Sequence, residues 1–75
     1  AAPTGTPVRS IGTGTVTFAG YSKAGGYTVK IQHNDRYSTE YLHLSRIDKT
    51  VRKGCKVGRG QVIGAVGATG LATGP

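Results

Sequence analysis

Several features on which other small domains depend are scarce in this sequence of 75 residues. Its one cysteine, Cys55, rules out an intrachain disulfide and a zinc site built from four cysteines. The longest apolar run is Val62 to Val66, far shorter than the roughly 20 residues that span a bilayer. We therefore expect no transmembrane segment, and the start of the sequence lacks the pattern of a signal peptide. The chain is expected to be soluble and already processed or trimmed.

Acidic residues are scarce as well. Ten lysines and arginines stand against three aspartates and glutamates, which gives a formal net charge of +7. A charge of this size attracts nucleic acid, anionic lipid or acidic polymers, and its sign does not choose among them. The main basic cluster consists of Lys49, Arg52, Lys53 and Lys56. We interpret it as a solvated surface, and the neighbouring Cys55 as a residue without a chemical role.

Chain length and glycine content limit the size of the core. A chain of this length buries only about 60% of the surface that it exposes when unfolded. The 13 glycines bring no side chains, and each loses more backbone freedom on folding than any other residue. The sequence therefore forms one domain at most, and that domain either needs further support or is a piece of a larger one.

Short β-prone runs alternate with glycine-rich or polar turns. The runs are Gly14 to Ala19, Tyr27 to His33, Tyr37 to Leu44 and Gln61 to Val66. No segment of helical length has apolar residues with a period of 3.6, so the pattern predicts an all-β fold of antiparallel strands, a sandwich or open barrel. The end of the sequence, residues 65–75, is rich in glycine and threonine and is predicted to be a loop.

The two middle runs predict a hairpin from about Tyr27 to Leu44. In the first run the odd positions are apolar or aromatic and the even ones polar, which is the period of a half-buried strand. The alternation resumes after the turn at residues 34–36. A three-residue loop predicts four pairs, which are His33 with Tyr37, Ile31 with Thr39, Val29 with Tyr41 and Tyr27 with His43. Tyr37, Thr39, Tyr41 and His43 are then expected on one face.

This register separates the two histidines. Residues 33 and 43 lie at opposite ends of the hairpin, about 20 Å apart at the usual rise of a strand. They cannot share a metal, and a catalytic zinc needs three protein ligands. Asp35, Glu40 and Asp48 have no ligand-like spacing to either histidine. The residues by themselves thus favour a packed ring at His43.

Three phrases, in this order and at this spacing, resemble one family. They are Ala1-Ala2-Pro3-Thr4-Gly5-Thr6-Pro7-Val8, then Tyr37-x-Thr39-x-Tyr41-x-His43-Leu44-Ser45, then Gly54-x-x-Val57-x-x-Gly60-Gln61-x-Ile63-Gly64-x-x-Gly67-x-Thr69-Gly70-x-x-Thr73-Gly74-Pro75. The chain resembles the catalytic domain of the lysostaphin-type zinc metalloendopeptidases, which cut peptide crosslinks in bacterial cell walls. The resemblance implies an antiparallel β-sandwich, or barrel-sandwich hybrid, in which residues 1–75 form the central part of one such domain.

The resemblance also indicates where the zinc ligands of this family lie. A His-x-x-x-Asp pair precedes the Ala-Ala-Pro phrase and a His-x-His pair follows Thr-Gly-Pro. The ligands are both residues of the first pair and the last histidine of the second, and none of them is in this sequence. The resemblance thus implies that the parent domain holds zinc, whereas this chain alone holds none and is inactive.

Few residues of this sequence match the active site of the family. His43 corresponds to a catalytic histidine that orients or deprotonates the zinc-bound water, or stabilises the oxyanion formed from the attacked amide. Tyr41, from the same phrase, and Tyr27 are expected to contact substrate. Tyr27 stands where the family often has asparagine after the glycine, so it is expected to reshape the groove near His43. His33 is interpreted as structural.

The expected partners are peptidoglycan peptide and anionic cell-wall polymers, and the expected location is the bacterial cell envelope, either periplasmic or secreted. A noncatalytic relative that binds wall polymer or activates an amidase is the main alternative. A biotinyl or lipoyl carrier is disfavoured because Lys49 precedes the Val-x-x-Gly hairpin instead of following it. A nucleic-acid binder is disfavoured because the tyrosines are not interleaved with basic residues on one face.

Overall fold

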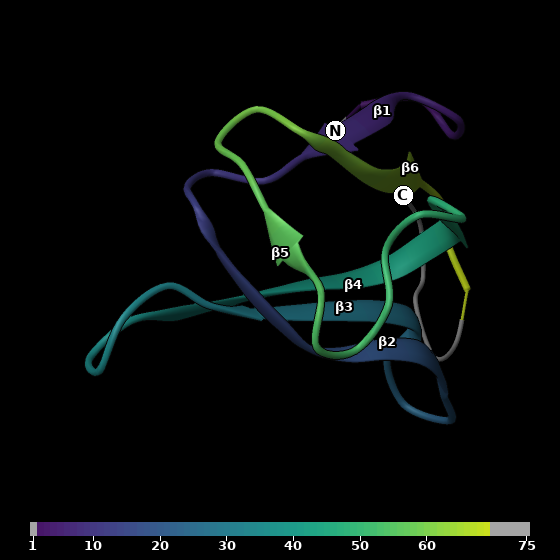
Figure 1. The fold of residues 1–75 in the computed structure, drawn as a ribbon. Coiled ribbons are helices and arrows are strands. Elements are labelled where there is room, and N and C mark those ends of the chain that lie inside the picture. Colours follow the sequence, from purple (N-terminus) through teal and green to yellow (C-terminus); the bar gives the residue numbers. More distant parts are fainter. Residues whose placement is uncertain (1, 70–75) are drawn as a thin grey trace.

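The computed structural model describes residues 2–69, and in that range the chain forms six strands and no helix (Figure 1). The strands are β1 (Pro7–Arg9), β2 (Gly14–Ser22), β3 (Gly26–Gln32), β4 (Ser38–Ile47), β5 (Lys56–Val57) and β6 (Val62–Val66). They form one sheet in the order β1-β6-β4-β3-β2-β5, and all its neighbours are antiparallel. The all-β prediction is confirmed. The sequence did not predict β1 and β5, which are too short to show an alternation.

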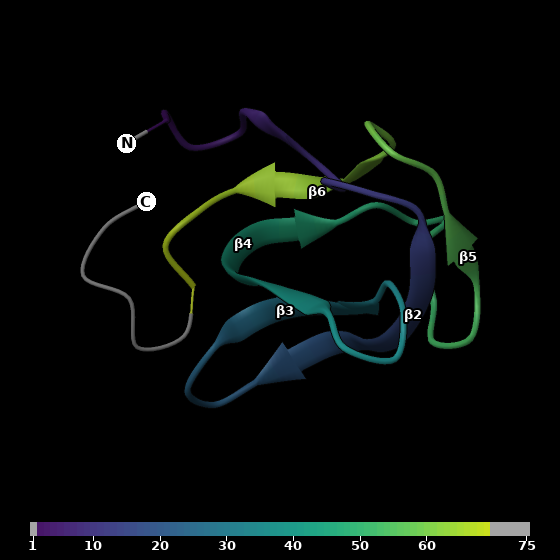
Figure 2. The same cartoon turned by 90° about the vertical axis from the view of Figure 1, so that its left-hand side faces the viewer.

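The sheet is strongly curled. Figure 2 shows β2 bending so that β5 stands across the layer formed by β6, β4 and β3. Only residues 58–61 join β5 at one edge to β6 near the other, so the two ends of the sheet must approach each other. Ser10 helps to close this gap, because its N–H donates to the Gln61 carbonyl (2.9 Å) and its carbonyl accepts from the Gly60 N–H (2.8 Å). The result is an open barrel around a small core.

The core lies inside this curl. Its buried residues are Val16, Val29, Ile31, Leu44, Val51, Val57 and Ile63. Val8, Ala19, Tyr41, Ile47 and Cys55 pack against them and are partly exposed. Every strand from β2 to β6 therefore contributes at least one buried apolar side chain, as expected for strands with one face turned inward.

The β3–β4 hairpin has the predicted register along most of its length. Val29 pairs with Tyr41 and Ile31 with Thr39. At the turn, the His33 N–H donates to the Tyr37 carbonyl (2.9 Å). The predicted pair of Tyr27 with His43 is wrong, because Tyr27 pairs with Leu44.

A β-bulge in β4 causes this difference. His43 has a φ of +57°, the one positive value at a non-glycine residue in the described part of the chain. An extra residue on one strand of an antiparallel pair bends that strand and shifts its alternation by one position. Tyr41 and Leu44 therefore both turn toward the interior, although they are three residues apart.

The alternation of β3 also changes beside the bulge. Tyr27 was expected on the apolar face together with Val29, but its side chain is 39% exposed, whereas Thr28 is 2% exposed. The Thr28 hydroxyl is satisfied by the Gly26 carbonyl (3.0 Å). The expectation for Tyr27 is thus wrong, because the register shifts between residues 27 and 29.

The end of the sequence is only partly a loop. Ala65 and Val66 belong to β6, where Ala65 pairs with both Pro7 of β1 and Arg46 of β4. Pairing with a strand on each side thus outweighs the weak local preference of these residues for a loop. Residues 67–69 follow outside any strand, and residues 70–75 of the predicted loop lie outside the described residues. No helix in the part that the structure describes could cross a membrane.

Candidate functional site

His43 is held at the bulge by its own backbone. Its N–H donates to the carbonyl of Gly25 (2.7 Å), which lies in the turn between β2 and β3. This turn is tightly packed, because a Cβ at Gly25 would come within 2.7 Å of the Thr28 hydroxyl. The bulge is therefore braced by the neighbouring turn, and the ring of His43 leaves β4 in a direction that a regular strand would not give it.

The His43 ring is oriented by one hydrogen bond. Its Nδ1 lies 2.7 Å from the backbone carbonyl of Thr69. A carbonyl oxygen only accepts, so Nδ1 carries a hydrogen in both the neutral and the charged ring. Nε2 is then the ring nitrogen that carries a hydrogen only in the charged ring. Among residues 2–69 no hydrogen bond engages Nε2, so this atom can accept or donate a proton.

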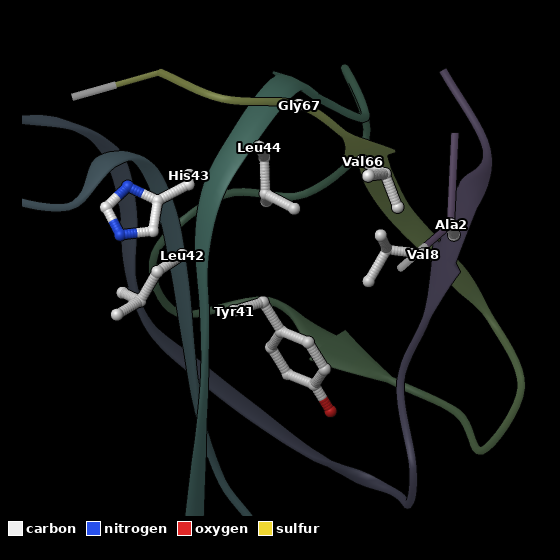
Figure 3. Close-up of a pocket in the computed structure, with 8 residues that line it drawn as sticks. All are labelled: Ala2, Val8, Tyr41, Leu42, His43, Leu44, Val66 and Gly67. Atoms are coloured by element: carbon white, nitrogen blue, oxygen red, sulfur yellow. The ribbon is translucent and has the colours of Figure 1, made fainter. Parts of the chain in front are cut away.

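A cavity of about 430 Å³ lies beside this histidine (Figure 3). Its lining is largely apolar and consists of Ala2, Val8, Tyr41, Leu42, His43, Leu44, Val66 and Gly67. These residues come from the start of the chain and from β1, β4, β6 and the segment after β6. The curl of the sheet thus brings three regions that are distant in sequence to one groove.

Tyr41 and His43 do not share a face. In Figure 3 their rings lie on opposite sides of the β4 ribbon, and the Tyr41 hydroxyl points away from His43. This hydroxyl accepts from the Ile11 N–H (3.1 Å) and is hydrogen-bonded to the Thr39 hydroxyl (3.1 Å). The expected common face is wrong at His43 because of the bulge. What Tyr41 presents to the cavity is its ring.

Tyr27 does not line this cavity. Its ring meets that of Tyr21 edge to face, with centroids 5.1 Å apart and an interplanar angle of 80°. Its N–H donates to the hydroxyl of Thr69 (3.0 Å). Tyr27 is therefore connected to His43 through Thr69. The rings of Tyr21 in β2 and Tyr27 in β3 are both exposed.

Thr69 is the site residue that reasoning from the sequence missed. The sequence predicts a loop at this position, yet Thr69 is hydrogen-bonded to His43, Tyr27 and the Leu44 carbonyl. The one signal for it in the sequence is its place in the third phrase, as a hydroxyl residue among glycines.

His33 lies in a different environment. Its Nδ1 is 2.7 Å from the Thr13 carbonyl, and its Nε2 is 2.8 Å from the Thr39 hydroxyl. Nδ1 thus joins the hairpin to the segment before β2, and Nε2 bonds the opposite strand of the hairpin itself. This geometry agrees with the interpretation of His33 as a structural residue.

The residues present do not make a zinc site. Every histidine, cysteine, aspartate and glutamate of the sequence lies within residues 2–69, and in this range no three of them come together as a metal would require. Asp48 instead stabilises the turn after β4. Hydrogen bonds from the Thr50 hydroxyl (2.6 Å) and N–H (3.0 Å), with smaller effects of the charges on Arg46 and Lys49, hold the pKa of its carboxyl below the ordinary value.

Comparisons with known proteins agree with one another. A sequence profile described as "Peptidase family M23" matches residues 1–75. The peptidoglycan DD-endopeptidase ShyA of Vibrio cholerae is 53% identical over 76 aligned positions, which cover all of this chain and 17% of ShyA. The chain thus spans about a sixth of that relative's length.

Two solved structures are similar along the whole chain. The crystal structure of a zinc-containing peptidase from Vibrio cholerae matches with a TM-score of 0.92 and 47% identity, over 100% of this chain and 22% of that one. The catalytic domain of lysostaphin from Staphylococcus simulans matches with a TM-score of 0.88 and 38% identity, over 99% of this chain and 56% of that one. These matches confirm the resemblance found in the three phrases and the fold expected from it.

Proposed function

This chain belongs to peptidase family M23, and from that membership we propose that residues 1–75 form the central part of a domain that hydrolyses peptide crosslinks in bacterial peptidoglycan. The similarity to ShyA, which is named a peptidoglycan DD-endopeptidase, supports this substrate class. The alternative of a noncatalytic relative is not favoured, because ShyA is named an endopeptidase and the two similar structures are named peptidases.

The observation that carries the proposal is the geometry of His43. Its Nδ1 is bound to a carbonyl and its Nε2 has no hydrogen-bond partner among residues 2–69. In the neutral ring Nε2 accepts a proton from an attacking water; in the charged ring it donates a hydrogen bond to the oxyanion or a proton to the departing amine. We assign His43 this catalytic role.

The proposed domain uses zinc that this chain does not hold by itself. One similar structure is that of a zinc-containing peptidase, and the residues described here offer no set of three ligands. The ligands would therefore come from segments other than residues 1–75. The chemistry that zinc supplies in such enzymes is an activated water and a polarised carbonyl.

The chain's own surface supplies the remaining contacts. We propose that Tyr41 forms part of the groove wall through its ring, and that the exposed Tyr27 ring contacts the substrate peptide near His43. The net charge of +7 suits anionic wall polymers, and the basic cluster at Lys49, Arg52, Lys53 and Lys56 is exposed. With these partners, the location that we propose is the bacterial cell envelope, periplasmic or secreted.

An exchange protein tests this function. It is ShyA in which the aligned segment is replaced by residues 1–75 of this chain, and it is compared with unaltered ShyA and with the 75-residue chain. We expect the exchange protein to bind zinc and to cleave peptidoglycan in a chelator-sensitive way, because the family's ligands then flank the chain. The chain alone should do neither.

Two results would contradict the proposal. Stoichiometric zinc and cleavage by the chain alone would show that the ligands are assigned to the wrong segments. A folded exchange protein that holds zinc but does not cleave peptidoglycan would show that this chain does not supply the catalytic groups. Zinc content by atomic emission and release of wall peptides by chromatography give both readouts.

A further inference from the structure

Thr69 makes three hydrogen bonds at the point where the hairpin is irregular. Its hydroxyl accepts from the Tyr27 N–H (3.0 Å) and donates to the Leu44 carbonyl, while its own carbonyl accepts from His43 Nδ1 (2.7 Å). Tyr27 and Leu44 are paired residues of β3 and β4. The hydroxyl thus lies between the N–H of one strand and the carbonyl of the other, beside the bulge.

The side chain of Thr69 fixes the position of its backbone. Residues 67–69 belong to no strand, so no ladder holds the carbonyl of Thr69 in place. The two bonds of the hydroxyl tie this segment to the hairpin that carries His43. Without the hydroxyl, the carbonyl loses the anchor that keeps it 2.7 Å from Nδ1.

From this geometry we infer that Thr69 is a positioning residue for His43: its hydroxyl bridge between Tyr27 and Leu44 holds the carbonyl that keeps the proton of the neutral ring on Nδ1. In a neutral histidine, the hydrogen bonds of the two ring nitrogens determine which of them carries the proton. A carbonyl at Nδ1 selects the form whose Nε2 has a free lone pair. The inference rests on the proposed catalytic role of His43 but concerns a separate property, the tautomer.

The tautomer can be measured without reference to activity. Nitrogen chemical shifts of the exchange protein, labelled with ¹⁵N-histidine and studied at a pH where the ring is neutral, distinguish a protonated Nδ1 from a protonated Nε2. We expect Nδ1–H for His43 in the unaltered chain. A predominant Nε2–H form would overturn the inference, whatever the variants show.

Substitutions at Thr69 separate the hydroxyl from the shape of the side chain. Thr69→Val keeps the branched shape and removes the hydroxyl, so His43 should become a mixture of tautomers. The turnover number should fall about 10- to 100-fold, a loss like that caused by removing the outer partners that orient metal-bound histidines, with KM and zinc content little changed. Thr69→Ser retains the hydroxyl and should restore both the tautomer and most of the turnover. If Thr69→Val does not fold, Thr69→Ala, which also lacks the hydroxyl, is compared with Thr69→Ser.

A matched control is available in β2. The Thr17 hydroxyl also binds a strand carbonyl, that of Lys30 (3.3 Å), away from His43. Thr17→Val should therefore leave tautomer and turnover unchanged. A pure Nδ1–H form in folded Thr69→Val would refute the inference while leaving the proposed function standing. Full activity of His43→Ala would instead refute the catalytic role of His43, whatever its tautomer.

Discussion

The two histidines of the hairpin differ in how their rings are bonded. Both nitrogens of His33 are engaged, by the Thr13 carbonyl and the Thr39 hydroxyl. In the described part of the chain, His43 is engaged through Nδ1 alone. A ring bonded at both ends joins segments together but has no atom left for a reacting group. A ring bonded at one end is oriented and keeps its other nitrogen for proton transfer.

His33 is therefore expected to matter for stability and not for chemistry. His33→Ala in the exchange protein removes two hydrogen bonds and should destabilise the domain by about 1–3 kcal/mol, seen as a lower melting temperature. Turnover per folded molecule should stay the same. Arg36→Ala, at an exposed position of the same hairpin turn, is the control and should change stability by no more than about 0.5 kcal/mol. A loss of turnover without a loss of stability would contradict the structural role.

The sequence could predict the role of His43 only in part. Its neighbours on the hairpin favoured a packed ring, and only the ordered phrases pointed to chemistry. Its orientation depends on Thr69, 26 residues further along the chain. A contact over this separation leaves no trace in local alternation, so the sequence predicts no more than a loop residue at Thr69.

Among the secondary-structure elements, the bulge in β4 determines the geometry of the site. Alternation predicted the hairpin, its turn and the pairs Val29 with Tyr41 and Ile31 with Thr39, all of which the structure contains. It could not predict the extra residue, because positive φ is uncommon outside glycine, and the enrichment of histidine at positive φ is too weak to single out one position. The bulge moved His43 to the other face and exposed Tyr27.

β4 packs closely against the segment after β6, and this packing can be tested by substitution. A Cβ on Gly67 would overlap the backbone N and Cα of Ser45. Gly67→Ala should therefore destabilise the domain by about 1–3 kcal/mol, the usual cost of overpacking, and should also lower turnover because it displaces the segment that carries Thr69. Melting temperature and turnover of the exchange protein give the two readouts.

Gly58→Ala is the matched control, because the nearest atom to its Cβ would be Gln61 Oε1 at 4.0 Å. It should change stability by no more than about 0.5 kcal/mol. Equal melting temperatures for the two alanine variants would show that β4 and this segment are not packed as closely as the structure has them.

At the scale of the whole molecule, the curl of the sheet assembles the groove. The sheet order places β6 between β1 and β4, so that Val8, Leu44 and Val66 border one cavity. Composition and alternation predicted the all-β class, since the two middle runs had the period of a strand and no segment had the period of a helix. They could not predict the strand order or the curl, because these depend on the two short strands and on contacts between distant residues.

The proposed mechanism can be tested most directly by the turnover of His43→Ala in the exchange protein, measured together with its zinc content. We predict that turnover falls about 10²-fold or more, as expected for loss of a general acid-base or oxyanion-stabilising group, while the bound zinc is unchanged. His33→Gln, at the other histidine of the hairpin, should retain turnover. If folded His43→Ala with its zinc in place kept full activity, His43 would be only a packed ring and the mechanism proposed for this chain would be wrong.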